Sequence, residues 1–378
     1  MTSSGYTFDV ASAREMSDAE IAEDVALGNV IHAEEMPEDA PYDVAAVIDT
    51  LRATPPRIGL WNLRARDRQG ELVAATSINK DWQHDENPDV GGIGVAVHPD
   101  HRGRGVGSTM LAYQVAFAQA LGETRLLIST SDRYPRAAEL ARALGGEAKS
   151  ESHVNELPRD EVDADLLRRW VSEAATRSAD YDLVAVDGRV PDEIVDDYVI
   201  LIGVMNDAPR DELVVNDFVL TVARLREYEE LADVRRDESW LLIARHRATG
   251  RLVGLHSVGW TPTNPKVLYI GLTGVESAHR GAALGKWMKA AMTLRALDER
   301  PEWSTIRTAN ADSNDAMLGI NAAMGYRPSI SMTTWETTRE RVETWLADRH
   351  VQVPDVRHLV DAQRPPAGRS SAAAPDGI

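Results

Sequence analysis

The sequence predicts an α/β fold, in the sense of mixed sheets flanked by helices, that is built twice along the chain. Segments with strand alternation and segments with helical spacing follow one another in both halves. An internal repeat locates the two copies: residues 97–107 read VHPDHRGRGVG and residues 275–285 read VESAHRGAALG. Aligning Arg102 with Arg280 gives an offset of 178 residues (280 − 102), close to half of the 378-residue chain. A repeat of this length predicts two tandem domains.

In the first half we expect two helices, followed by a sheet with further helices inserted. The second helix begins at Pro41, since proline is favoured at a helix start, and the last helix ends at Gly145, since glycine is favoured just after a helix end. A turn at Gln69-Gly70 joins the first two strands. The expected helices are 18–29, 41–53, 108–121 and 136–144, and the expected strands are 57–67, 71–78, 92–97, 124–130 and 149–157.

The second half repeats this order and opens with a strand. Its hairpin turns at Thr249-Gly250, and its helix before the last strand ends at Gly325. The expected strands are 181–186, 240–245, 252–260, 268–273, 305–308 and 331–336, and the expected helices are 191–206, 219–231, 286–297, 314–324 and 338–349.

Residues 158–180 join the halves. Their apolar side chains Leu166, Leu167, Trp170 and Val171 follow helical spacing, which predicts a connecting helix packed on one domain. The end of the chain, from residue 364, is rich in Pro, Ala, Gly and Ser and is expected to be unstructured. The expected domains are therefore an N-terminal domain at 1–157, the connecting helix at 158–180, a C-terminal domain at 181–345, and a helix end with a tail at 346–378.

The composition restricts which partners and which cellular compartment fit this protein. A formal net charge of −19 disfavours nucleic acids and anionic membranes and favours cationic partners, although solubility alone explains it equally well. The absence of cysteine excludes disulfides, thiolate nucleophiles and cysteine–zinc sites. No run reaches the roughly 18 apolar residues of a membrane span, and the N-terminus lacks the basic and apolar regions of a signal peptide. We therefore expect a cytoplasmic protein.

Each glycine-rich turn lies between a strand and a helix start. Residues 102–107 have the form R-x-x-G-x-G, and residues 280–285 have the form R-x-x-A-x-G. Small residues let backbone N–H groups approach a phosphate closely, and the start of the following helix adds partial positive charge. One such motif would be weak evidence, but its position and its repetition predict a diphosphate site in each half.

With these two turns the chain resembles the GCN5-related N-acetyltransferase (GNAT) superfamily in a tandem form. The resemblance implies acetyl-CoA or another acyl-CoA as co-substrate, a V-shaped split in each sheet, and a pantetheine arm that pairs with the strand before the turn. It places the diphosphate and the arm on two sets of residues. The first set is Val95, Val97, Arg102, Gly103, Arg104, Gly105, Val106 and Gly107, and the second is Thr273, Gly274, Val275, Arg280, Gly281, Ala282, Ala283, Leu284, Gly285 and Asn314.

A second signature of the superfamily, N-x-x-A-x-x-x-Y-x-x-x-G-F, distinguishes the halves. The second half keeps Asn314 and ends on Gly325-Tyr326, but Asn321 stands where the family has the tyrosine that protonates the departing thiolate. Asn321 can donate a hydrogen bond to sulfur but cannot release a proton as a phenol does. The first half has neither the Asn nor the Tyr. We therefore expect the C-terminal domain to be catalytic and the N-terminal domain to be a degenerate copy used for structure, dimerisation or regulation.

Acyl transfer to an amine also needs a general base. The candidates are Asp207 on a loop, His256 within a strand, and Glu276 after the pantetheine-pairing strand. Each has a plainer interpretation, as a turn residue, a half-buried histidine and a solvated carboxylate respectively. Tyr269 and Tyr326 are candidate acids, although packing explains both. No motif of metal-ligand spacing is present, so no metal is expected.

The predicted function is acetyl transfer from acetyl-CoA to an amine of a small, cationic molecule, without membrane or nucleic-acid partners. Two alternatives stay open: an amide-forming transferase of the same fold that uses aminoacyl-tRNA, and a non-catalytic CoA-binding protein. If the N-terminal copy serves dimerisation, the protein is a homodimer. The loops 82–89, 206–213 and 260–266 are expected to shape the acceptor pocket.

Overall fold

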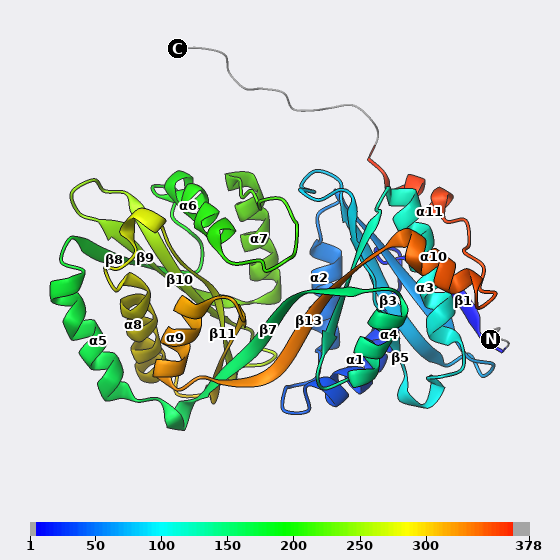
Figure 1. The fold of residues 1–378 in the computed structure, drawn as a ribbon, viewed down its shortest axis with the longest axis horizontal. Coiled ribbons are helices and arrows are strands. Elements are labelled where there is room, and N and C mark those ends of the chain that lie inside the picture. The colour runs from blue at the N-terminus through cyan, green and yellow to red at the C-terminus, as the bar shows by residue number, and fades with distance from the viewer. Residues whose placement is uncertain (1–4, 366–378) are drawn as a thin grey trace, which may run out of the picture.

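The chain forms two lobes of strands flanked by helices (Figure 1). A four-stranded antiparallel sheet belongs to the N-terminal lobe, and a nine-stranded mixed sheet runs through both lobes. The computed structural model describes residues 5–365, so most of the tail expected from residue 364 lies outside it. The α/β fold with mixed sheets that the sequence predicts is confirmed. None of the helices in the described part of the chain combines the length and the apolar character that a membrane span requires.

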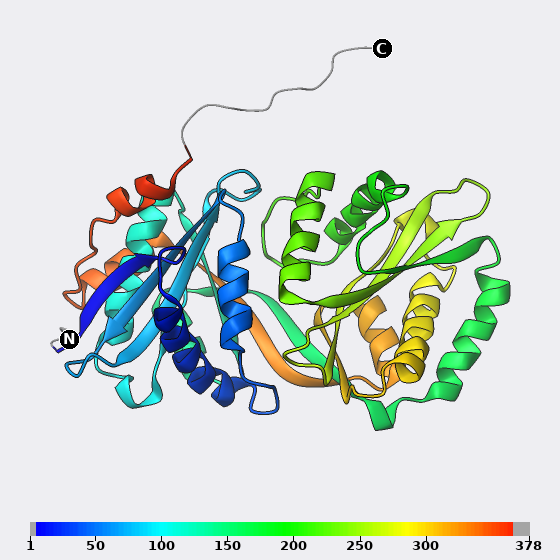
Figure 2. The ribbon, with the colours of Figure 1, turned by 180° about the vertical axis from the view of Figure 1, so that it is seen from behind.

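The N-terminal lobe starts with a strand that the sequence analysis did not predict. This strand, β1 (Thr7–Ser12), runs antiparallel to β2 (Ile58–Arg66). Helix α1 (Asp18–Glu35) begins at a capping box formed by Ser17 and Glu20, and this helix and the next one cover one face of the strands (Figure 2). The remaining elements of this segment are α2 (Val44–Ala53), β3 (Leu72–Asp81), α3 (Val106–Leu121), β6 (Arg125–Ser131) and α4 (Pro135–Ala143).

The strand expected at 92–97 is divided in two. Its first part, β4 (Val90–Gly92), pairs in parallel with β6, and its second part, β5 (Ala96–Val97), pairs antiparallel with β3. The three residues between them follow neither neighbour fully, because the strands on the two sides diverge. This divergence opens the sheet of the N-terminal lobe.

The C-terminal lobe opens in the same place. Strand β11 (Val267–Val275) pairs with β12 (Thr305–Ala311) only as far as Tyr269, while its pairing with β10 (Leu252–Trp260) continues to Val275. The helix expected at 191–206 is shorter, and a 3₁₀ helix (Ile202–Asp207) follows it. The other elements are α5 (Ala164–Arg177), β8 (Tyr181–Asp187), α6 (Val195–Leu201), α7 (Val222–Arg235), β9 (Glu238–His246), α8 (Leu284–Glu299) and α9 (Asp315–Met324).

The lobes exchange their last strands. Strand β7 (Glu147–Pro158), from the first half of the chain, pairs with β12, and β13 (Arg327–Thr338), from the second half, pairs with β6. The exchanged strands also pair with each other, so one sheet of nine strands runs through both lobes. In Figure 1 they cross between the lobes as the green and orange ribbons. The chain then stays on the N-terminal lobe, where α10 (Arg339–Ala347) and α11 (Arg357–Gln363) pack on α3.

Ion pairs add to this connection. The buried guanidinium of Arg307, on β12, lies 2.7 Å from the carboxylate of Asp39 in the N-terminal lobe. On the other side, Arg224 of α7 donates to Glu86 at 2.6 Å, and Arg57 bonds to Glu227 of the same helix. Because these charges are largely removed from water, they are screened little and fix how the lobes sit against each other.

Candidate functional site

The two glycine turns have the same backbone geometry. Each has two residues with positive φ, and in each the arginine Nε donates to the carbonyl oxygen of the last strand residue, at 2.9 Å in the first turn and 3.1 Å in the second. The second positive φ is at the residue that caps the helix, Gly105 (φ 87°) before α3 and Ala283 (φ 60°) before α8. Position 283 therefore holds alanine in a conformation that favours glycine, since a Cβ costs about 1–2 kcal/mol there.

A tyrosine–histidine contact also recurs. The hydroxyl of Tyr6, just before β1, lies 3.2 Å from Nδ1 of His101, and the hydroxyl of Tyr181, at the start of β8, lies 2.9 Å from Nδ1 of His279. The histidine before each turn thus links the turn to the first strand of its own lobe. Among residues 5–365, no group of three or more His, Asp or Glu side chains is placed to hold a metal ion.

A cavity of about 560 Å³ lies at the second turn. It is bordered by the start of α8, the end of β11, the start of α9 and the segment after α6. Of the residues predicted for this half, Ala282 is not part of the lining, because it packs in the core and its carbonyl accepts from Ser178 Oγ at 2.6 Å. The predicted residues that line the cavity are Thr273, Gly274, Val275, Arg280, Gly281, Ala283, Leu284, Gly285 and Asn314.

The first turn is more enclosed than the second. Both terminal nitrogens of Arg102 bond to the carboxylate of Glu34, and the guanidinium lies 4.7 Å from the ring centre of Tyr134. Tyr134 caps α4, the place that Asn314 has before α9. The Arg102 side chain is 20% exposed, whereas that of Arg280 is 54% exposed.

The strand opening of the N-terminal lobe is already hydrogen-bonded. The buried amide of Gln114, on α3, accepts from the backbone N–H of Gly94 at 2.8 Å and donates to its carbonyl at 2.5 Å. A groove of about 530 Å³ runs beside these groups, with Val95 among its lining residues. Val97 is buried in the core of this lobe.

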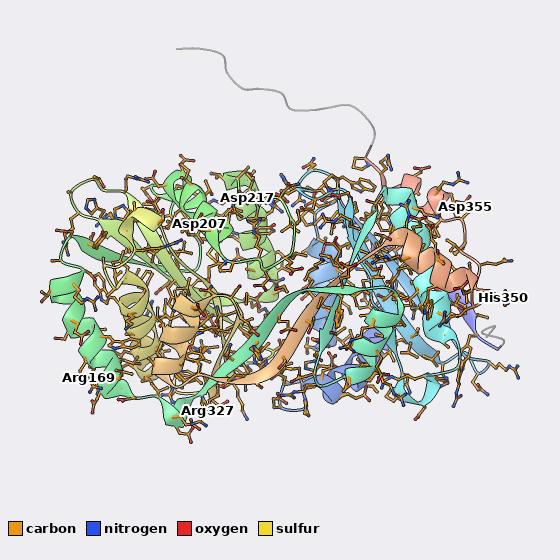
Figure 3. The ribbon with its side chains drawn as sticks, viewed as in Figure 1. Arg169, Asp207, Asp217, Arg327, His350 and Asp355 are labelled. Carbon is orange, nitrogen blue, oxygen red and sulfur yellow. The ribbon has the colours of Figure 1, made fainter. Side chains whose placement is uncertain are left out.

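Of the three candidate bases, Asp207 is the one that lines the cavity. Its carboxylate lies 3.1 Å from the guanidinium of Arg280, and Figure 3 shows it in the C-terminal lobe on the side of α6. Glu276 pairs with Arg251 at 3.0 Å outside the cavity lining. His256 is buried, and its Nδ1 lies 2.8 Å from Thr273 Oγ1. Burial, and then the charge of a neighbouring lysine, hold the pKa of His256 well below its ordinary value.

That lysine, Lys289, was missed by the sequence analysis. It lies on α8, one turn after Gly285, and its buried Nζ donates to Oδ1 of Asn321 at 2.7 Å. Asn321 in turn donates to Oδ1 of Asn310 at 2.7 Å. Burial lowers the pKa of Lys289 to about 7. The sequence held one indication that Lys289 is buried: it stands between two apolar residues, Met288 and Ala290, in a helix that packs its apolar residues against the sheet.

Comparison with known proteins identifies the fold. The model of the acetyltransferase (GNAT) family matches residues 28–145. A tandem GNAT protein from the clavulanic acid biosynthesis pathway superposes with a TM-score of 0.70 at 25% identity, covering 88% of this chain and 98% of that one. A GCN5-related N-acetyltransferase from Sphaerobacter thermophilus gives a TM-score of 0.59 at 13% identity, covering 88% and 96%.

A search of curated protein sequences found no match. The matched family model and the tandem neighbour, together with the repeated turn, confirm the resemblance seen in the sequence. Members of this family are acyltransferases, and their fold binds acyl-CoA. Residues 28–145 match the GNAT family model, and the whole chain resembles a tandem GNAT protein, with two copies of the fold joined through exchanged strands.

Proposed function

We propose that the C-terminal lobe binds acetyl-CoA in the 560 Å³ cavity and transfers its acetyl group to the amine of a small, cationic molecule in the cytoplasm. The observation that carries this proposal is the composition of the cavity wall. The second glycine turn, the strand end at Thr273–Val275 and Asn314 come from three separate segments and border one space. A diphosphate in this space faces the N-terminus of α8, which supplies unpaired N–H groups and partial positive charge.

The contrast between the lobes supports the choice of the C-terminal one. Arg280 is half exposed and has one carboxylate partner, whereas Arg102 has a two-point contact with Glu34 and a contact with an aromatic ring. A diphosphate at the first turn must displace these contacts. An extended ligand that pairs with the strand must also displace the Gln114 amide from Gly94. Both displacements lower the affinity of the N-terminal lobe.

Two observations support a small, cationic acceptor. The net charge of −19 gives the protein a negative surface potential, which raises the concentration of cations close to its surface. The similar tandem GNAT protein comes from the clavulanic acid biosynthesis pathway, which makes a small molecule. An amine that is cationic in solution must lose a proton before it attacks the thioester.

The test is a mass-spectrometric screen of an amine panel with acetyl-CoA. CoA release can be followed in parallel with a thiol reagent, because the chain has no cysteine to contribute background. We expect at least one amine to be acetylated, and Arg280→Ala to slow that reaction at limiting acetyl-CoA more than Arg102→Ala does. Binding of acetyl-CoA without acetylation of any amine would support a non-catalytic CoA-binding protein. Product formed only with charged tRNA would support the tRNA-dependent alternative.

Asp207→Asn separates two roles of this carboxylate. The pair with Arg280 is exposed on both sides, so it is worth at most about 1 kcal/mol, and its loss frees Arg280 for a diphosphate. We expect acetyl-CoA to bind up to about fivefold more tightly, with kcat retained. Calorimetry and steady-state kinetics measure the two quantities. A fall in kcat of a hundredfold or more, at unchanged affinity, would instead identify Asp207 as the general base.

A further inference from the structure

A buried polar cluster lies behind the wall of the cavity. We define it as His256, Thr273, Lys289, Asn310 and Asn321. Thr273 lines the cavity and bonds to His256. Lys289 and Asn321 are connected to the cavity wall through the helices on which they lie, α8 and α9.

Each of those helices leads from the cavity into the cluster. On α8, Gly285 lines the cavity and Lys289 follows one turn later. On α9, Met317 lines the cavity and Asn321 follows one turn later. Residues four apart lie on the same side of a helix. The cluster therefore lies directly beyond the cavity, at the end away from the glycine turn.

The charge in this cluster lacks an acidic partner. Lys289 is 1% exposed, and the ion pairs of residues 5–365 include no carboxylate for it. An ammonium group has three N–H donors, and the hydrogen bond to Asn321 accounts for one of them. The titratable groups that face it are His256, on β10, and Tyr326, whose ring centre lies 5.4 Å from Nζ and whose buried hydroxyl has no hydrogen-bond partner. A buried cation with spare donors is costly unless an electron-rich group binds to it.

We propose that Lys289 is a catalytic residue, whose ammonium group binds the sulfur of acyl-CoA and protonates the thiolate as it leaves. The proposal rests on the proposed function of the same cavity. The acceptor nitrogen attacks the thioester carbon, a C–N bond forms and the C–S bond breaks. The electron pair of that bond stays on sulfur and takes a proton from Lys289. The surplus proton of the new amide nitrogen goes to water, and Lys289 regains a proton from water.

The surroundings of Lys289 suit this step. Burial lowers its pKa to about 7, so it can release a proton near neutral pH and recover it. Asn321, which stands where the family has its tyrosine, supplies an acceptor that holds the amine in place. The proton donor therefore lies on α8, whereas the tyrosine of the family lies at the position of Asn321 on α9. Both positions lie at the same end of the cavity.

The experiment compares CoA with desulfo-CoA, which lacks the sulfur, by calorimetry at about pH 6, below the pKa of Lys289, where its amine is mostly protonated. The wild type is expected to bind CoA about tenfold more tightly than desulfo-CoA, since a hydrogen bond to a charged group is stronger than one between neutral groups. Lys289→Met is expected to bind both equally, at the wild-type affinity for desulfo-CoA. Arg168→Met removes one positive charge at an exposed site on α5, outside the cavity lining of the same lobe, and should keep the tenfold preference.

Stability measurements check the fold of the variant. Because burial favours the neutral amine in the folded state, wild-type stability should rise as the pH increases from about 7 toward the ordinary pKa of lysine. Lys289→Met should lack this rise and melt no lower than the wild type at pH 7. If it fails to fold, Lys289→Gln, which keeps a hydrogen-bond donor without the charge, takes its place.

The outcomes separate this inference from the proposed function. If the wild type binds neither CoA nor desulfo-CoA, the proposed function fails. If it binds both, and Lys289→Met keeps the wild-type preference for CoA, the function stands and the role of Lys289 is refuted. Equal binding of both ligands by the wild type refutes that role as well.

Discussion

Glutamate at position 285 is expected to abolish acetyl-CoA binding by the C-terminal lobe. Gly285 lines the cavity at the start of α8, where the diphosphate is proposed to lie. A Cβ built there meets only Ile320 Cδ1 within 4 Å, at 3.6 Å, so the fold accepts a side chain. The carboxylate would then face a second anion, which costs several kcal/mol, and the affinity should fall by roughly a hundredfold or more. Calorimetry with acetyl-CoA measures this loss.

The repeat supplies a matched control. Gly107 occupies the same place in the first turn, and a Cβ there meets Val95 Cγ2 at 3.6 Å and Val97 Cγ2 at 3.9 Å. Gly107→Glu thus makes the same chemical change in equivalent space and is expected to leave the affinity for acetyl-CoA unchanged. The opposite result, loss with Gly107→Glu and retention with Gly285→Glu, would assign the acyl-CoA site to the N-terminal lobe.

Trp335→Ala is expected to destabilise the N-terminal lobe, although Trp335 belongs to the last fifth of the chain. Its ring is 7% exposed and packs in a core cluster with Ile128 and Val342, and its Nε1 donates to Thr130 Oγ1 at 2.8 Å. Replacing a buried tryptophan by alanine costs about 3–5 kcal/mol. Amide hydrogen exchange should show faster opening of β6 than of β12.

Trp303→Ala is the matched comparison for Trp335→Ala. Trp303 is also buried, at 1% exposure, and its Nε1 donates to the carbonyl of Ala296 at 2.9 Å within the C-terminal lobe. It should open β12 before β6, the reverse of the order expected for Trp335→Ala. If both variants open the same strands first, the exchanged strands do not carry separate stability for the two lobes.

Much of the fold follows from local patterns. The helix starts at Ser17 and Asn314 and the ends at Gly122 and Gly325 reflect capping chemistry that a sequence displays directly. Strand β1 was missed although Thr7–Val10 alternate between exposed and half-buried side chains, because an alternation of four residues is the shortest that indicates a strand. The repeat held a further signal, since the second half opens with a predicted strand and the first half should do the same.

The candidate site also has one part that the sequence predicts and one part that it does not. The backbone of each glycine turn depends on neighbours in sequence, so the motif around Arg280 was visible without a structure. Lys289, Asn310 and His256 lie far apart in the chain and meet only when α8, β12 and β10 pack together. No spacing rule predicts such a cluster, because each residue considered alone fits an ordinary helix or strand.

The sequence by itself determined that this protein has two copies of one α/β fold, each with a turn suited to a diphosphate. Local backbone preferences and short-range periodicity are sufficient for that. Only the tertiary structure decided that the last strands change places, that Gln114 hydrogen-bonds the strand opening of one lobe, and that a lysine lies buried behind the cavity of the other. These features depend on hydrogen bonds and burial between segments distant in the chain, whose free energies no local pattern records.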